Sequence, residues 1–203
     1  MIAVVDYDVG NIRSVLFALR RLQRDAELTD NPSLLQGADG LILPGVGAFA
    51  PAMDQLRERG LDDVVCQFAD SGRPLLGICL GHQLLFSESE EHGRHGGLNL
   101  LPGQVVRFER GLKVPHMGWN QVDQTAACSL FEDIESGEFF YFAHSYYTLP
   151  AESEVSVGST DYGRTFTSVA SRDNVFGTQF HPEKSGAVGL KMLSNFCCLC
   201  EED

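Results

Sequence analysis

Short apolar runs alternate with segments of helical periodicity through the first part of the chain, and this alternation limits the possible folds more than any other feature. The runs at 2–5, 40–43 and 74–79 have the length and aliphatic character of strands that are buried on both faces. Apolar residues recur at helical spacing over 12–22 and again over roughly 49–71. Strands that alternate with helices over short connections form a mostly parallel central sheet with helices on both faces.

The second part of the chain has a different pattern, in which strand-like pieces follow one another. Segments 103–108, 138–143 and 165–170 predict strands, and we expect them to form an antiparallel extension of the same sheet. A further strand is predicted over 175–180 and a closing helix over 187–198. The fold class is therefore α/β, with a parallel centre and an antiparallel extension.

Length, charge and cysteine usage narrow the class of protein. Since the 203 residues contain no internal repeat and no linker, we expect a single domain over residues 1–203. The 15 Lys and Arg against 28 Asp and Glu give a net charge of −13, which argues against nucleic acid as a partner because phosphate contacts need a basic face. No apolar stretch approaches the roughly 18 to 20 residues of a membrane span. No basic leader precedes the first apolar run, so we expect six reduced cysteines and a soluble, cytoplasmic protein.

The segment 77–81, Gly-Ile-Cys-Leu-Gly, joins a buried strand to a helical stretch that includes residues 83–86. A nucleophile on such a sharp turn takes an unusual backbone conformation, and the residues two before and two after it must lack side chains. Gly77 and Gly81 meet that demand. The turn exposes the sulfur of Cys79 near a helix N-terminus, which favours a thiolate. The alternative is a buried structural cysteine.

A nucleophilic thiol needs a base, and the base needs a group that fixes its tautomer. His181, Pro182 and Glu183 follow the strand predicted at 175–180. In an extended segment residues two apart project to the same side, so we expect Glu183 to orient the imidazole of His181. Cys79, His181 and Glu183 together predict a catalytic triad.

The segment 44–47, Pro-Gly-Val-Gly, follows the strand at 40–43. In a parallel sheet this end lies on the same edge as the end of the cysteine strand. Glycines on either side of Val46 let backbone N–H groups approach a substrate closely, as binding an oxyanion requires. The alternative is a plain glycine turn.

These three segments together resemble the class I (triad) glutamine amidotransferases. Segments 7–14, 115–120 and 141–147 are more specifically similar to the glutaminase subunits of imidazole glycerol phosphate synthase, and the resemblance extends from residue 2 to about residue 196. It implies hydrolysis of glutamine to glutamate and ammonia through a thioester on Cys79, without a cofactor. It also implies a heterodimer with a (β/α)8-barrel synthase subunit that receives the ammonia for histidine biosynthesis.

The resemblance assigns further roles to residues at matching positions. His181 takes the thiol proton and protonates the departing ammonia. The backbone around four residues would bind the oxyanion: Gly45, Val46, Gly47 and Leu80. Glutamine would be held by Gln83, Glu91, Ser145 and Tyr146. Because a few large residues usually supply most of the binding energy of an interface, we expect the aromatic Trp119 to anchor the partner, together with Asn11, Pro115, His116 and Met117.

Some features depart from this pattern or are set aside. His82 stands beside the predicted nucleophile where the family usually has methionine, so it is a second candidate for the base, but the prediction keeps His181 in that role. His92 and His95 lie in a glycine-rich segment that we interpret as a solvated loop, and no metal site is predicted. The Cys-x-x-Cys spacing at 197–200 has no second pair of ligands and is interpreted as an inert helix end.

Three other functions stay open from the residues alone. They are the glutaminase of another amidotransferase, a cysteine peptidase or esterase built on the same turn, and a non-catalytic module that keeps the fold. The occupied triad positions argue against the last of these.

Overall fold

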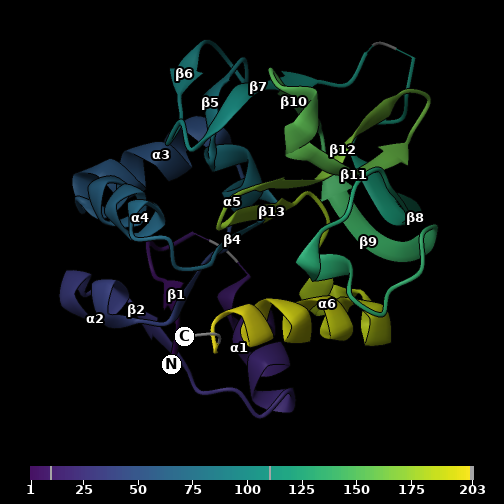
Figure 1. Ribbon diagram of the computed structural model, residues 1–203. Helices are drawn as coiled ribbons and strands as arrows, with labels where there is room; N and C mark the ends of the chain where they lie inside the picture. Colours follow the sequence, from purple (N-terminus) through teal and green to yellow (C-terminus); the bar gives the residue numbers. More distant parts are fainter. Residues whose placement is uncertain (10, 110, 202–203) are drawn as a thin grey trace.

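The computed structural model describes residues 1–9, 11–109 and 111–201, and these residues are organised around one 13-stranded sheet (Figure 1). Gly10, which belongs to the segment 7–14 used above, lies outside the described residues. One half of the sheet is parallel, with strand order β2-β1-β3-β4-β13. Its strands are β1 Ile2–Val5, β2 Ala26–Thr29, β3 Gly40–Leu43, β4 Leu75–Ile78 and β13 Val175–Thr178.

Helices cover the parallel half on both faces. Alternate residues of β1 and β3 explain the division, because Ala3 and Leu41 pack toward α2, α3 and α4, whereas Val4 and Ile42 pack toward α1 and α6. Figure 1 shows the two groups of helices on opposite sides of β1. The helices are α1 Ile12–Arg21, α2 Pro32–Gly37, α3 Phe49–Glu58, α4 Leu61–Asp70, α5 Leu80–Leu84 and α6 Gly186–Leu199. No described helix has both the length and the apolar character to cross a membrane.

The other half of the sheet is mainly antiparallel. It continues from β13 through β12, β10, β7, β5 and β6, and a branch from β12 leads through β11 and β8 to β9. Only the β5–β7 pair in this half is parallel among the described strands. The strands are β5 Phe86–Ser89, β6 His95–Gly96, β7 Leu101–Arg107, β8 His116–Gln124, β9 Glu138–His144, β10 Tyr146–Pro150, β11 Ser156–Asp161 and β12 Thr165–Arg172.

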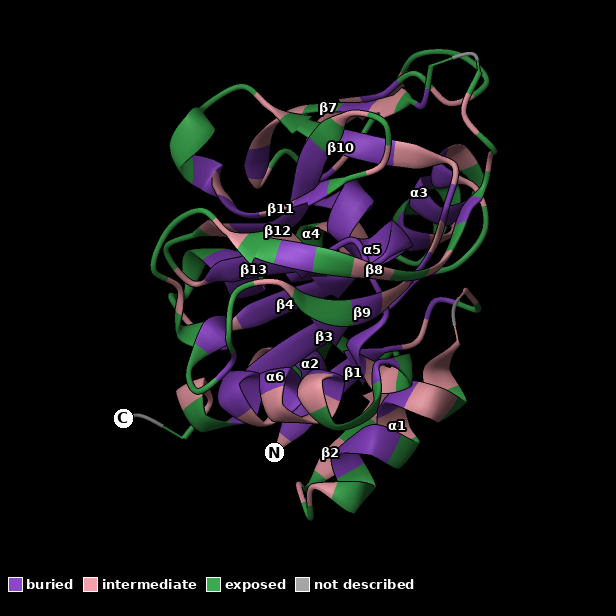
Figure 2. Cartoon of the chain, turned by 90° about the vertical axis from the view of Figure 1, so that its right-hand side faces the viewer, coloured by how far each residue is buried: buried purple, intermediate pink, exposed green. Residues whose placement is uncertain are grey.

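This architecture confirms the predicted fold class, with local differences. The stretch expected as one helix over 49–71 is two helices, because Gly60 takes a left-handed conformation with φ 65° and redirects the chain. Phe86, expected at the end of a helix, begins strand β5 and is fully buried. Figure 2 shows β3, β4 and β13 in the buried colour, whereas β8 alternates between buried and exposed residues.

Candidate active site

Cys79 lies at the junction of β4 and α5, in a backbone conformation with φ 54° and ψ −105°. This conformation is rarely adopted by residues with a side chain, and it turns the chain sharply from strand to helix. A Cβ on Gly77 would lie 2.7 Å from the carbonyl oxygen of Gly81, and a Cβ on Gly81 would collide with the carbonyl of Leu43. The turn therefore closes only because both positions lack side chains.

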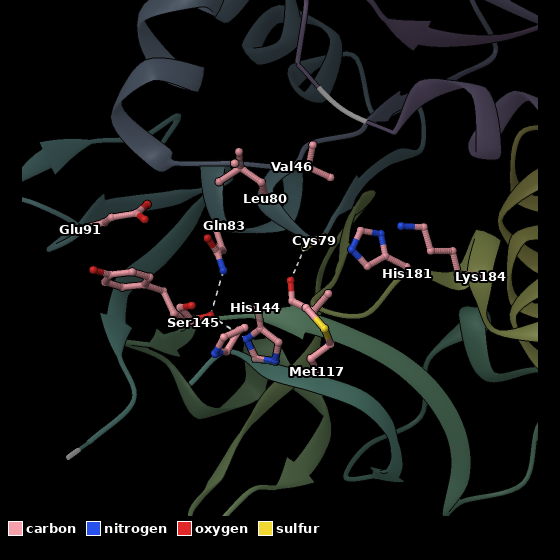
Figure 3. A pocket seen from close by; sticks show the side chains of 14 residues that line it. Val46, Cys79, Leu80, Gln83, Glu91, Met117, His144, Ser145, His181 and Lys184 are labelled. Carbon is pink, nitrogen blue, oxygen red and sulfur yellow. Dashed lines mark hydrogen bonds between the residues drawn. The ribbon is translucent and has the colours of Figure 1, made fainter. Parts of the chain in front are cut away.

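The sulfur of Cys79 faces a cavity of about 290 Å³ at the carboxyl edge of the parallel strands. Figure 3 shows Glu91 and His181 at opposite ends of this cavity, with Gln83 and Cys79 between them. The cavity brings together residues predicted from the triad, the oxyanion segment and the glutamine contacts: Val46, Gly47, Cys79, Leu80, Gln83, Glu91, Ser145, Tyr146 and His181. Gly45 and Glu183 lie behind this lining.

His181 and Glu183 form a buried pair, with 2.9 Å between Nδ1 and Oε1 and with side chains that are 3% and 1% exposed. Burial alone would lower the pKa of His181, but the neighbouring Cys79 and Glu183 side chains raise it to about 10. The imidazolium is thus favoured beside the thiol. The local structure differs from the extended segment we expected, since Pro182–Lys184 is a 3-10 turn that begins directly after His181.

The segment 44–47 has a fixed end and an open end. The buried Tyr7 hydroxyl donates a hydrogen bond of 2.5 Å to the carbonyl of Pro44. Gly45 is packed so tightly that a Cβ there would lie 2.8 Å from the backbone nitrogen of Gly81 and 2.9 Å from the Tyr7 oxygen. Val46 and Gly47 are exposed, and Gly47 has φ 102°. Both residues line the cavity together with Leu80, and the first N–H groups of α5 have no acceptor within that helix.

The predicted glutamine contacts are already engaged within the protein. The Gln83 amide donates to the carbonyl of Tyr146 at 2.9 Å and to Oε1 of Gln179 at 3.0 Å. Glu91 accepts a hydrogen bond of 2.7 Å from the backbone nitrogen of Phe49, the first residue of α3. Gln83 therefore holds the wall of the cavity, and Glu91 lines the cavity with one carboxylate oxygen fixed by the start of α3.

Sequence reasoning missed Gln179 as a member of the site. Its side chain is fully buried, and its amide nitrogen lies 4.0 Å from the sulfur of Cys79. The carbonyl oxygen of Ala143 lies at the same distance on another side of the sulfur. The only sequence signal for Gln179 is its position two residues before His181 at the end of a buried strand.

His82 points away from the cavity, so its position beside Cys79 does not make it the base. It is fully buried, its Nε2 lies 3.0 Å from the hydroxyl of Thr148, and its ring packs against Gly177 and Phe86. Burial lowers the pKa of His82 to about 3, which keeps the ring neutral. This arrangement removes the competition with His181.

The residues assigned to the partner surface do not all reach the surface. Met117 and Trp119 are 64% and 56% exposed, Pro115 is exposed, and Asn11 is half-buried just before α1. His116 is only 3% exposed, which corrects its assignment, because its side chain lies on the opposite face of β8 from Met117.

The predicted solvated loop is also partly ordered, since His95 belongs to strand β6 and pairs with β5. Within the described part of the chain, no group of three or more His, Cys, Asp or Glu side chains is arranged to hold a metal ion.

Comparisons with known proteins give one consistent result. Residues 3–200 match the sequence model of the family "Glutamine amidotransferase class-I". A relative from Syntrophotalea carbinolica, "Imidazole glycerol phosphate synthase subunit HisH", is 52% identical over 203 residues, which cover 97% of this chain and 98% of the relative. A relative of the same name from Moorella thermoacetica is 54% identical over 195 residues, covering 96% and 93%.

Solved structures share the fold at lower identity. The crystal structure of a glutamine amidotransferase superposes with a TM-score of 0.78 at 21% identity, and covers 98% of this chain and 99% of that one. The structure of PurLQS from Thermotoga maritima gives a TM-score of 0.71 at 20% identity, with 97% coverage of both chains. These structural matches establish the fold, and the sequence matches extend over nearly the whole chain.

Proposed function

Because the chain belongs to the class I glutamine amidotransferase family, we infer that it is the glutaminase subunit of an imidazole glycerol phosphate synthase. It hydrolyses glutamine to glutamate and ammonia. The names of the relatives speak against the alternatives considered from the sequence, which were another amidotransferase, a cysteine peptidase or esterase, and a non-catalytic module. The observation that carries the site assignment is the cavity in which Cys79 faces the buried His181–Glu183 pair.

In the first half of the reaction the thiolate of Cys79 attacks the carboxamide carbon of glutamine. The raised pKa of His181 supports a thiolate beside an imidazolium as the starting state. When the tetrahedral intermediate collapses, the C–N bond breaks and His181 gives its proton to the departing nitrogen. Ammonia leaves, and a thioester with neutral His181 remains.

In the second half, water is the nucleophile. Neutral His181 accepts a proton from the water as its oxygen attacks the thioester carbon. The C–S bond then breaks, which restores the thiolate and the imidazolium and releases glutamate, whose new carboxyl group gives its proton to solvent. Glu183 holds the imidazole through Nδ1 in both halves, so that Nε2 is the nitrogen that exchanges protons.

We assign the oxyanion to backbone N–H groups at the open end of the segment 44–47 and at Leu80, with Gly45 supporting the segment from behind. The exposed Val46 and the glycine at 47 allow a peptide to reorient there, whereas Tyr7 holds Pro44. Partner binding is proposed to select the active orientation, so that the free subunit turns over slowly.

Glutamine is proposed to lie along the cavity between Cys79 and Glu91. The second carboxylate oxygen of Glu91 suits the α-ammonium group, and Ser145 with the backbone of Tyr146 suits the other end of the amino acid. The oxygen of the Gln83 amide stays available because its nitrogen is engaged.

The partner is proposed to be a (β/α)8-barrel synthase subunit that forms a heterodimer and receives the ammonia. Exposed Met117 lines the cavity mouth, and exposed Trp119 lies two residues along the same strand. The continuous sheet supports one amidotransferase domain over residues 1–203. Cytoplasmic location stays a prediction.

The assignment is tested with Cys79→Ala in the complex with a barrel synthase subunit. Glutamine-dependent synthesis should fall by at least about 10³-fold, while synthesis from added ammonium chloride stays within about twofold, since the change removes one sulfur. Cys66→Ala is the matched control, because this half-buried thiol contacts only the carbonyl of Leu98 among its described hydrogen-bond partners. Undiminished glutamine-dependent synthesis in Cys79→Ala would overturn the role of Cys79, and loss of both activities would indicate a structural role.

A further inference from the structure

A chain of hydrogen bonds runs from strand β8 to the wall of the glutamine cavity. Nδ1 of His144 lies 2.7 Å from the carbonyl oxygen of Tyr146, and Nε2 of His144 lies 2.9 Å from Nδ1 of His116. Nε2 of His116 lies 3.2 Å from the amide nitrogen of Asn120, which also donates to the carbonyl of Asp161 at 2.9 Å. The two imidazoles are opposite each other in the β8–β9 pair, and both are buried.

The chemistry of the groups fixes the direction of every bond. A carbonyl oxygen only accepts, so Nδ1 of His144 carries the proton and its Nε2 is an acceptor. Nδ1 of His116 must then be the donor, and its Nε2 accepts from the amide of Asn120. Burial lowers the pKa of His144 to about 3 and that of His116 to about 4, so both rings are neutral near pH 7, as this single arrangement requires.

The carbonyl of Tyr146 is where this chain meets the catalytic machinery. It also accepts from the amide of Gln83 at 2.9 Å, and the same amide donates to Gln179 at 3.0 Å. The amide nitrogen of Gln179 in turn lies 4.0 Å from the sulfur of Cys79. Figure 3 shows His144 and Gln83 approaching the segment after Ser145 from two sides. The position of the Tyr146 peptide is therefore tied to the nucleophile on one side and to β8 on the other.

Packing alone does not explain why positions 116 and 144 in the β8–β9 pair are histidines. Their neighbours are aromatic rings, and His116 stacks on Tyr162 and Phe142 with centroids 4.0 and 4.8 Å apart. A phenylalanine would fill such a core equally well, whereas buried imidazole nitrogens must find partners. Unlike phenylalanine, the two imidazoles provide a chain of hydrogen bonds from Asn120 to the carbonyl of Tyr146, with the donor of each bond fixed.

We propose that His144 and His116 are positioning residues for glutamine hydrolysis, which hold the Tyr146 carbonyl and with it the Ser145–Tyr146 wall of the glutamine cavity. The proposal rests on the proposed function and adds two residues to it. Neither residue exchanges a proton with the substrate in this role.

Two substitutions at His144 test separately the hydrogen bonds made by its Nδ1 and by its Nε2. An asparagine amide reaches about as far as Nδ1 and can still donate to the Tyr146 carbonyl, whereas a glutamine amide reaches about as far as Nε2 and meets only His116. In the complex with the synthase subunit, we expect H144Q to raise the KM for glutamine roughly tenfold, with kcat changed less than about threefold. H144N should keep the KM within about threefold of the wild type. Equal KM values in the two variants, or a loss confined to kcat, would overturn the proposal.

A measurement on the unmodified protein decides the matter if the variants do not fold. Nitrogen-15 NMR of the imidazoles should show His116 and His144 both protonated at Nδ1 and unprotonated at Nε2. A proton at Nε2 of either ring would break the chain and overturn the proposal. Wild-type glutaminase activity, recorded beside these experiments, tests the proposed function separately, because the tautomers do not depend on which substrate the cavity takes.

Discussion

The parallel and antiparallel halves of the sheet build the site in different ways. In the parallel half, Cys79 is placed by backbone geometry, with Gly77 and Gly81 so close that no side chain fits between the segments. In the antiparallel half, the cavity wall is placed by side-chain hydrogen bonds such as those of Gln83 and His144. Cys79, the proposed nucleophile, is thus fixed by backbone contacts that leave no room for adjustment, whereas the wall of the cavity depends on side-chain hydrogen bonds that can be changed one at a time.

The largest expected effect is the loss of stability when a side chain is added to the tightly packed turn in the parallel half. In Gly81→Ala the new Cβ would collide with the backbone of Leu43 and lie 3.3 Å from the backbone of Pro44, neither of which can move without shifting β3. We expect a loss of about 3 kcal/mol or more in the free energy of unfolding. Gly37→Ala is the matched control, because beyond its chain neighbours and its own helix backbone no atom would lie within 4 Å of the new Cβ, and it should stabilise by about 0.4–1 kcal/mol.

Urea unfolding of the two variants measures this difference. Equal stability of Gly81→Ala and Gly37→Ala would show that the turn relaxes, and the contrast between the two halves would then lose its physical basis.

The strands that could be predicted from the sequence are those buried on both faces, since such strands are continuous runs of apolar residues. The apolar runs of β1, β3 and β4 were readable because neither face meets solvent. Strand β8 was not recognised because its pattern is inverted: Met117 and Trp119 face outward, while His116 and Asn120 face inward. An interpretation that places apolar residues inside cannot find such a strand.

The residues of the proposed triad could be selected from the sequence by type and spacing, but their local structure could not be predicted. The 3-10 turn after His181 depends on tertiary contacts, such as the hydrogen bond from the Ser185 hydroxyl to the carbonyl of His181. Gln179 was missed because its contacts, to Gln83 and Cys79, join residues about a hundred positions apart in the chain. Spacing in the sequence carries no signal for such pairs.

The next largest effect is expected at the His181–Glu183 pair, which lies where the parallel and antiparallel halves meet. Glu183→Gln removes the charge that helps to raise the pKa of His181, so this pKa should fall from about 10. We expect glutaminase activity to drop by about 10²- to 10⁴-fold. NMR titration of the His181 imidazole measures the pKa, and an unchanged value would contradict the assigned role of Glu183.

The same pair gives a defined pH dependence of stability. A histidine whose pKa is raised in the folded state binds more protons when folded, so its stabilisation is fully present below its ordinary pKa of 6.5. It is lost as the pH rises from there through about 10. The difference in unfolding free energy between wild type and Glu183→Gln should therefore shrink over this window. A constant difference would show that the pair contributes nothing through protonation.

The smallest expected effect is on the outer face of the antiparallel half. Trp119→Ala should leave the fold intact, because the side chain is 56% exposed, but should weaken binding of the barrel subunit by about 2 kcal/mol. Stimulation of glutaminase activity should fall accordingly when the partner is limiting. Leu34→Ala is the control, since this leucine is 39% exposed on α2, away from β8 (Figure 1). A titration with partner that gives the same affinity for both variants would remove Trp119 from the interface.

The close approach of Gly45 and Gly77 to Gly81 also limits which mutations of the gene the protein can tolerate. Any codon change that replaces one of these glycines yields a residue with a Cβ or a larger side chain. At Gly45 that carbon would lie 2.8 Å from the backbone of Gly81, and at Gly77 it would lie 2.7 Å from the same residue. None of the three glycines therefore has a neutral replacement, although synonymous changes of their codons leave the protein unaltered. We therefore expect inherited changes that alter the cavity wall to fall in the antiparallel half, with the three glycines around Cys79 retained.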